Sequence, residues 1–127
     1  MNTAIERFHT GPRMSKIVRH AGVIYLCGQT SSVSPARNAN EQTREVLARI
    51  DALLSEAGSG RERLLAATVH LREMADFAAM NQVWEAWLPA GAAPARTTVQ
   101  ARLAAPELRV EITVVAATSP PVVLHCA

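Results

Sequence analysis

The stretch that decides the fold lies near the C-terminus, where residues 94–103 read PARTTVQARL and residues 110–117 read VEITVVAA. Apolar and polar side chains alternate in both runs, a pattern typical of β-strands with one buried face. The first run holds Arg96, with Arg102 near its end, and the second holds Glu111. Arg96 and Glu111 each stand near the start of a largely apolar run. Burial of an unpaired charge costs free energy, so a charged residue in such a setting is expected to have a charged partner or a function. The two residues are the first candidates for a functional site.

These two strands are expected to be antiparallel neighbours, because residues 104–109, which include Pro106, are enough to turn between them. The alternation of side chains along a strand puts Arg96 and Thr98 on the same face of the first strand. In the second strand it puts Glu111 on the face opposite to the apolar residues. Alignment of the two polar faces would bring the three side chains together. We therefore expect a constellation built from both strands.

Two amphipathic helices precede these strands. Residues 41–57 carry apolar side chains at helical spacing, which predicts a helix. Asn38 with Glu41 suits a capping box at its start, and Gly58 suits its C-terminal end. A second helix with one apolar stripe is expected after Asp76, whose side chain suits an N-cap. Each helix has a single apolar face, so each must cover a sheet.

The remaining strands complete an α+β pattern. Residues 15–20 and 23–27 indicate a hairpin, and residues 65–72 a strand with Leu65 on its buried face. His70 falls on the more polar face, where a surface or hydrogen-bonded role is expected rather than catalysis. The order ββαβαββ predicts a two-layer domain with both helices on one face of the sheet. The other face is apolar enough to predict packing against further copies of the chain.

Composition narrows the classes of function. A chain of 127 residues fits one domain, and a net charge of +2 indicates neither a nucleic-acid partner nor a membrane surface. The N-terminus has no apolar signal segment, so a cytoplasmic location is expected. Cys27 and Cys126 are expected to be free thiols. The four histidines lack metal-ligand spacing, and no metal is assigned.

Short motifs along the chain occur in the order known from one protein family. They are Cys27-Gly28-Gln29, Gln42-Thr43, Asp76-Phe77-Ala78-Ala79-Met80-Asn81, Pro94-Ala95-Arg96 and Val110-Glu111-Ile112. From Gly11 to Ala117 the chain resembles the reactive intermediate deaminase family (RidA, also called YjgF). The resemblance implies a chorismate-mutase-like fold over residues 1–118, with a mixed sheet, and a C-terminal extension at 119–127. It also implies a homotrimer with ligand sites in the clefts between subunits.

The resemblance further implies a reaction, the cofactor-independent hydrolysis of enamine or imine acids to 2-oxo acids and ammonia. Arg96 would hold the carboxylate of the substrate through a two-pronged guanidinium pair. Glu111 would orient or activate the attacking water. Backbone groups near Gly28 and Arg96 would bind the developing polar centre, and Asn81 would have a supporting role.

The chain departs from the family pattern beside this site. Cys27 stands where the family has a serine, and Thr98 stands where it has a cysteine. A tyrosine that follows Gly-Pro in well-known deaminases is replaced by Arg13. Cys27 and Thr98 are therefore expected to contact the substrate and to alter its selection.

Three alternatives to imine hydrolysis stay open. Arg96 and Glu111 could form a structural ion pair at a subunit interface, where arginine is common. The protein could bind or sense small carboxylates without reaction. RNA cleavage or nucleic-acid binding, proposed for members of the family, is least favoured because it needs a basic groove.

Overall fold

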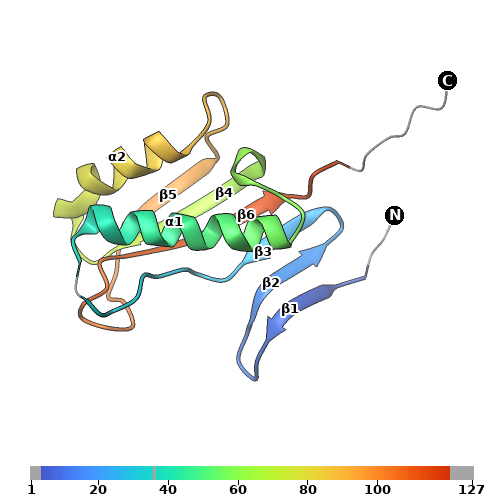
Figure 1. Cartoon of the computed structure of the whole chain (residues 1–127), viewed down its shortest axis with the longest axis horizontal. Helices are drawn as coiled ribbons and strands as arrows, with labels where there is room; N and C mark the ends of the chain where they lie inside the picture. Colours follow the sequence, from blue (N-terminus) through green and yellow to red (C-terminus); the bar gives the residue numbers. More distant parts are fainter. Residues whose placement is uncertain (1–3, 36, 121–127) are drawn as a thin grey trace.

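The computed structural model describes residues 4–35 and 37–120, and within them two helices cover one face of a mixed, six-stranded sheet (Figure 1). The strands are β1 (Glu6–Thr10), β2 (Ser15–His20), β3 (Val23–Leu26), β4 (Leu64–Leu71), β5 (Ala95–Gln100) and β6 (Val110–Ala117). The helices are α1 (Ala39–Glu56) and α2 (Phe77–Trp87), with short 3-10 helices at Arg61–Arg63 and Met74–Asp76. The predicted two-layer α+β architecture is confirmed. The predicted extension falls outside the described residues from residue 121 onwards, as does Cys126.

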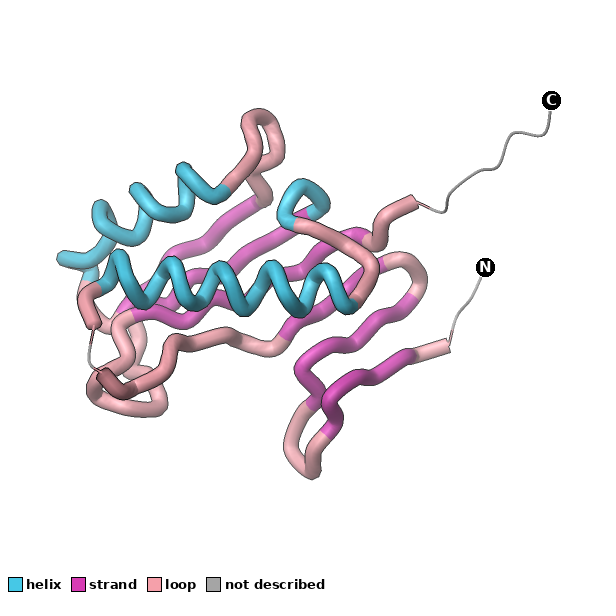
Figure 2. The backbone as a smooth tube through the Cα atoms, viewed as in Figure 1, coloured by secondary structure: helices cyan, strands magenta, loops and turns pink. Residues whose placement is uncertain are grey.

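The order of elements is βββαβαββ, one strand more than predicted. β1 pairs antiparallel with β2, and Figure 2 shows it as the outer strand next to β2. Phe8 is its only apolar residue and packs partly buried against the core. A strand at a sheet edge buries few side chains, so its sequence carries little alternation. The pattern of residues 6–10 gave no signal for this reason.

The order of strands across the sheet is β1-β2-β3-β6-β4-β5. β4 lies between β5 and β6, pairing parallel with β5 and antiparallel with β6. The predicted antiparallel pairing of β5 with β6 is therefore wrong. The reason lies in α2, which leads from β4 to β5: a helix between two strands is the usual crossover that makes them parallel neighbours. β6 then pairs with the other edge of β4.

The ends of α1 confirm the expected caps. The Asn38 side chain accepts a hydrogen bond from the Glu41 backbone N–H at 2.9 Å, as part of a complete capping box. Gly58 adopts a φ of 82° just after the helix, and the Ser59 N–H donates to the Leu54 carbonyl at 2.8 Å. Asp76 precedes α2 as expected, but its side chain makes no capping bond and instead pairs with Arg109.

The core lies between the helices and one face of the sheet. In β6 every second residue is buried, namely Val110, Ile112, Val114 and Ala116. In β4 the register with β6 shifts between Leu64 and Ala66, which leaves Leu65 49% exposed instead of buried as expected. The sheet face away from the helices, here called the open face, carries Thr68, His70, Thr97, Val99, Glu111, Thr113 and Val115. No helix among the described residues is long and apolar enough to cross a membrane.

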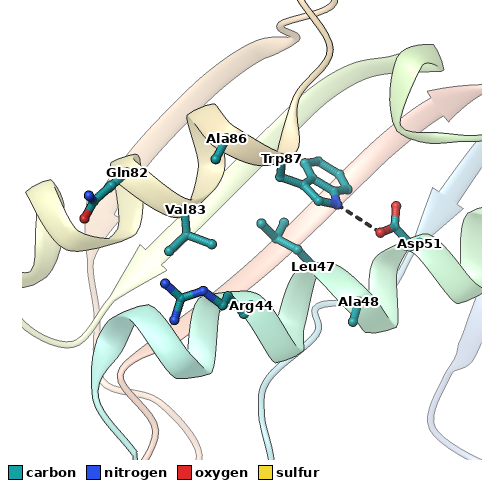
Figure 3. Close-up of a pocket in the computed structure, with 8 residues that line it drawn as sticks. All are labelled: Arg44, Leu47, Ala48, Asp51, Gln82, Val83, Ala86 and Trp87. Carbon is teal, nitrogen blue, oxygen red and sulfur yellow. Dashed lines mark hydrogen bonds between the residues drawn. The ribbon is translucent and has the colours of Figure 1, made fainter.

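Asp51 of α1 ties the two helices together. Its Oδ2 accepts a hydrogen bond from Trp87 Nε1 at 3.0 Å, drawn in Figure 3. Arg61 reaches the same carboxylate with Nε at 3.1 Å and Nη2 at 2.6 Å. The Arg61 guanidinium also lies 5.0 Å from the centre of the Trp87 ring. This network fixes the C-terminal end of α2, from which the chain continues into β5.

Asp51→Ala is expected to lower the free energy of unfolding by about 1–2 kcal/mol, because it removes the acceptor of three hydrogen bonds that are only part-exposed. Urea titration followed by tryptophan fluorescence measures the change. Glu85→Ala is the matched control, since Glu85 is exposed on α2 and makes no ion pair with the described residues. Equal stability of the two variants would contradict the role of the network.

Candidate functional site

Glu111 lies on the open face, with the backbone of Gly28 against its side chain. Gln29 bridges to Ile112, with N–H to carbonyl distances of 2.9 and 3.1 Å, and this pairing brings the segment after β3 alongside β6. A Cβ on Gly28 would lie 2.9 Å from Cδ and 3.0 Å from Oε2 of Glu111, too close for any real contact. The Glu111 side chain is still 36% exposed. Its carboxylate is therefore held on one side and accessible on another.

His70 stands opposite Glu111 in the pairing of β4 with β6. Its Nδ1 lies 4.0 Å from Glu111 Oε1 and has no hydrogen-bond partner among the described residues, although water cannot reach it. Sequence reasoning set His70 aside as a surface or hydrogen-bonded residue. Its position on the polar face of a strand could have marked it as a candidate. Only the register of β4 with β6 shows that Glu111 is its neighbour. Gly28, His70 and Glu111 are called the Glu111 cluster below.

Arg96 lies on the other side of the sheet, under α2. Its guanidinium carbon is 5.6 Å from the centre of a Trp84 ring and 5.8 Å from that of Phe77, which are cation–π distances. Its Nη1 is 4.0 Å from Met80 Sδ. Within the described part of the chain, no carboxylate forms an ion pair with Arg96. The charge rests on aromatic rings and is not neutralised by an acidic side chain.

Thr98 follows this arginine on the same face of β5, and Asn81 lies on the side of α2 that carries the rings over Arg96. Thr98 is two residues along β5, on the same face, and its buried Oγ1 has no hydrogen-bond partner in the described part of the chain. Asn81 follows Phe77 by four residues in α2 and precedes Trp84 by three, so it shares their side of the helix. Asn81, Arg96 and Thr98 are called the Arg96 cluster.

The predicted constellation of Arg96, Thr98 and Glu111 is wrong within one chain. Arg96 pairs in register with Ala67, which is buried beneath the helices, whereas Glu111 pairs with His70 on the open face. Because β4 separates their strands, parity within each strand alone could not align the two polar faces. The six candidate residues thus divide between opposite faces of the sheet, and an Arg96–Glu111 ion pair does not form inside the chain.

The family of the chain follows from comparison with known proteins. The family model described as endoribonuclease L-PSP matches residues 4–118. The chain belongs to this family. It is 44% identical over 113 residues to the RutC family protein YoaB of Escherichia coli, covering 89% of this chain and 97% of that protein. A crystal structure of a YjgF family member from Neisseria meningitidis has a TM-score of 0.89 and 45% identity, with 94% of this chain and 98% of that one covered.

One L-PSP family relative carries a name that states a reaction. The 3-aminoacrylate deaminase RutC of Acinetobacter baylyi is 35% identical over 104 residues, which cover 82% of this chain and 81% of that protein. The resemblance to the RidA/YjgF family is confirmed by these matches, and so is the chorismate-mutase-like fold.

Cys27 borders the Glu111 cluster in this family member. It is a free, half-buried thiol that precedes Gly28 in sequence. Its Sγ accepts a hydrogen bond from Gln29 Nε2 at 3.3 Å, and its carbonyl oxygen accepts from the same nitrogen at 3.2 Å. The thiol is thus engaged by its own loop, and the carbonyl holds the turn that carries Gly28.

A groove between α1 and α2, drawn in Figure 3, lies apart from both clusters. Its lining includes Leu47, Val83 and Trp87 but none of the candidate residues. Within residues 4–35 and 37–120, no three His, Cys, Asp or Glu side chains gather as a metal site. The chemistry of the candidate site therefore rests on the two clusters.

Gly28→Ala is expected to displace the Glu111 carboxylate without unfolding the protein. The added methyl would meet the flexible end of Glu111 at 2.9–3.0 Å, so the side chain must move. Such a rotamer change costs about 0.5–1.5 kcal/mol, whereas a shift of about 1 Å in a reacting group can cost on the order of 100-fold in rate. Thermal unfolding and the imine assay described below measure the two effects.

Gly11→Ala is the matched control for Gly28→Ala. A Cβ at Gly11 would meet only the Met14 carbonyl oxygen, at 3.9 Å, an ordinary van der Waals contact. We expect wild-type rates from this variant. Unchanged activity of Gly28→Ala would show that the close approach to Glu111 has no functional purpose.

Proposed function

We propose that the protein hydrolyses enamine or imine acids to 2-oxo acids and ammonia. The observation that carries the proposal is the state of Glu111, a part-exposed carboxylate held against the Gly28 backbone with no arginine or lysine partner in the described residues. A carboxylate that is not neutralised by a strong cation can accept a proton from water. The 3-aminoacrylate deaminase among the relatives acts on an enamine acid, which supports the same reaction class here.

The site is proposed to form between two copies of the chain. β5 is an edge strand, and unpaired sheet edges are normally covered. On the open face Val99 is 40% exposed and Tyr25, which is opposite Val115 in register, 47%. An apolar sheet face of this kind favours association. A homotrimer, as the family resemblance implies, would place the Arg96 cluster of one copy beside the Glu111 cluster of the next.

In the proposed reaction, the guanidinium of Arg96 binds the substrate carboxylate through two parallel hydrogen bonds. An enamine first takes a proton on its β-carbon and loses one from its nitrogen, and thereby becomes the imine. Glu111 accepts one proton from water while the water oxygen forms a bond to the imine carbon. Glu111 then returns that proton to the nitrogen, which gives the carbinolamine. Glu111 next transfers the proton of the new hydroxyl group to the nitrogen, so the C–N bond breaks and ammonia leaves as the C=O bond forms. Imine and water are thereby converted to oxo acid and ammonia without a cofactor.

A carboxylate-binding protein without catalysis is the second candidate. It is favoured by Arg96, whose charge has no acidic partner in the described residues and rests on Phe77 and Trp84. Such a cation would bind a carboxylate whether or not a reaction follows. RNA cleavage is less favoured, because a net charge of +2 supplies few phosphate contacts.

The test generates the imine in place, with an amino-acid oxidase or a pyridoxal-phosphate-dependent dehydratase as its source. We expect the protein to accelerate the release of ammonia and 2-oxo acid beyond the rate of spontaneous hydrolysis. A binder would instead leave that rate unchanged while 2-oxo acids raise its melting temperature. That second result would exclude the deaminase and establish the alternative.

A further inference from the structure

We propose that His70 is a positioning residue that holds Glu111 by a hydrogen bond from its Nδ1. The inference rests on the proposed function and adds a residue that the family resemblance did not assign. His70 and Glu111 are directly opposite in the pairing of β4 with β6, and Nδ1 lies 4.0 Å from Oε1. A side-chain rotation that moves either atom by about 1 Å brings the two atoms within hydrogen-bond distance.

The burial of His70 Nδ1 favours a hydrogen bond from this nitrogen to Glu111. The atom exposes less than 1 Å² and has no hydrogen-bond partner within residues 4–35 and 37–120, while the side chain as a whole is 30% exposed. A buried polar nitrogen without a partner costs free energy, and the nearest charged acceptor is Glu111. Nδ1 therefore faces the carboxylate, and the exposed part of the ring leaves Nε2 as the nitrogen towards solvent.

The two oxygens of Glu111 then have different tasks. Oε1 is the oxygen nearer His70, whereas Oε2 lies where a Cβ on Gly28 would come within 3.0 Å. A hydrogen bond from Nδ1 to Oε1 fixes the plane of the carboxylate and leaves Oε2 to take the proton from water. Such orientation of a base by a third group is common in hydrolytic sites.

Within β4, β5 and β6 the open face carries no charged group that competes with His70 for Glu111. Arg72 and Arg109 lie just beyond these strands and are bonded to backbone carbonyls and to Asp76, respectively. The neighbours on the open face are Thr68 from β4, Val99 from β5 and Thr113 from β6, all of which are uncharged. In the described residues His70 is the only basic side chain that forms an ion contact with Glu111. A histidine is suited to this place because its neutral ring can donate from one nitrogen without neutralising the base.

The first test observes the hydrogen bond itself, independently of activity. Nitrogen–proton correlation NMR at pH 8.5, where imidazoles are ordinarily neutral, reports which ring nitrogen of His70 carries the proton. We expect Nδ1–H in the wild type and a change to the solvent-favoured Nε2–H form in Glu111→Ala. The same pattern in both proteins would overturn the inference, even if the deaminase activity is present.

The second test separates positioning from a structural role. His70→Phe is expected to lower kcat roughly 10-fold or more with KM within about twofold, because substrate binding by Arg96 is retained. His70→Asn, whose amide can donate from nearly the position of Nδ1, is expected to recover most of kcat. In a Glu111→Ala background the His70→Phe change should have no further effect. An unaltered kcat in His70→Phe would overturn the positioning role of His70. An equal loss of kcat in His70→Phe and His70→Asn would overturn it as well.

His20→Phe is the matched control, since His20 lies at the end of β2, two strands away from β6, and bonds the Ala4 carbonyl at 3.4 Å. It should leave kcat unchanged. An inactive wild-type protein would refute the proposed function, and the positioning role with it, whereas the NMR pattern would still report whether the hydrogen bond exists. The two failures are thus distinguishable.

Discussion

Replacing Arg96 with methionine is expected to lower kcat/KM for imine hydrolysis by at least about 100-fold, because the charged, bidentate contact with the carboxylate is lost. Methionine is chosen over alanine since the arginine side chain packs over Trp84 and Phe77, and a long apolar side chain keeps that packing. The loss should therefore appear in activity and not in stability. The in situ imine assay and thermal unfolding measure both.

Two further variants sharpen this test. Arg96→Lys retains the charge but not the planar fork, so we expect activity between those of Arg96→Met and the wild type. Arg102→Met removes an exposed arginine two residues beyond β5 and should leave activity unchanged. Melting-temperature increases with 2-oxo acids should vanish in Arg96→Met alone. Full activity in that variant would remove Arg96 from the site and with it the reason to join the two clusters.

Local patterns predicted most of the fold. The alternation in residues 110–117 identified β6 and its buried face correctly, and the Asn38–Glu41 capping box fixed the start of α1. These signals are local, because the period of the side chains and the hydrogen bonds of the caps depend on neighbouring residues alone. β1 was not predicted, because its burial depends on pairing with β2 and its sequence contains a single apolar residue.

The arrangement of the candidate site needed information that local patterns do not contain. Whether Arg96 and Glu111 share a face depends on the order of strands, and β4 stands between theirs. Parity within each strand was correct, but the relative phase of the two strands is set by their separate registers with β4. The approach of Gly28 to Glu111 likewise arises from the bridge of Gln29 to Ile112, between segments far apart in the sequence. His70 became a candidate only through the same kind of long-range pairing.

Replacing Glu111 with glutamine is expected to lower kcat by about 10²–10⁴-fold, the usual contribution of a general base. The amide has nearly the same shape and can still accept a hydrogen bond from His70, but it cannot take a proton from water. The fold should persist, because Glu111 lies on the open face with its side chain 36% exposed. Single-turnover ammonia release measures the change, and Glu107→Gln, at an exposed glutamate before β6, is the matched control.

The comparison of the two variants decides between enzyme and binder. If Arg96 binds the carboxylate and Glu111 acts on water, Glu111→Gln should lose turnover yet keep the melting-temperature increase with 2-oxo acids, whereas Arg96→Met should lose both. A protein that only binds carboxylates would respond to Arg96→Met and be indifferent to Glu111→Gln. Loss of ligand stabilisation in both would instead mean that the two residues act on binding as one unit, as an ion pair between subunits would. Glu111→Gln is therefore the decisive variant, because the enzyme, the carboxylate binder and the ion pair between subunits each predict a different result for it.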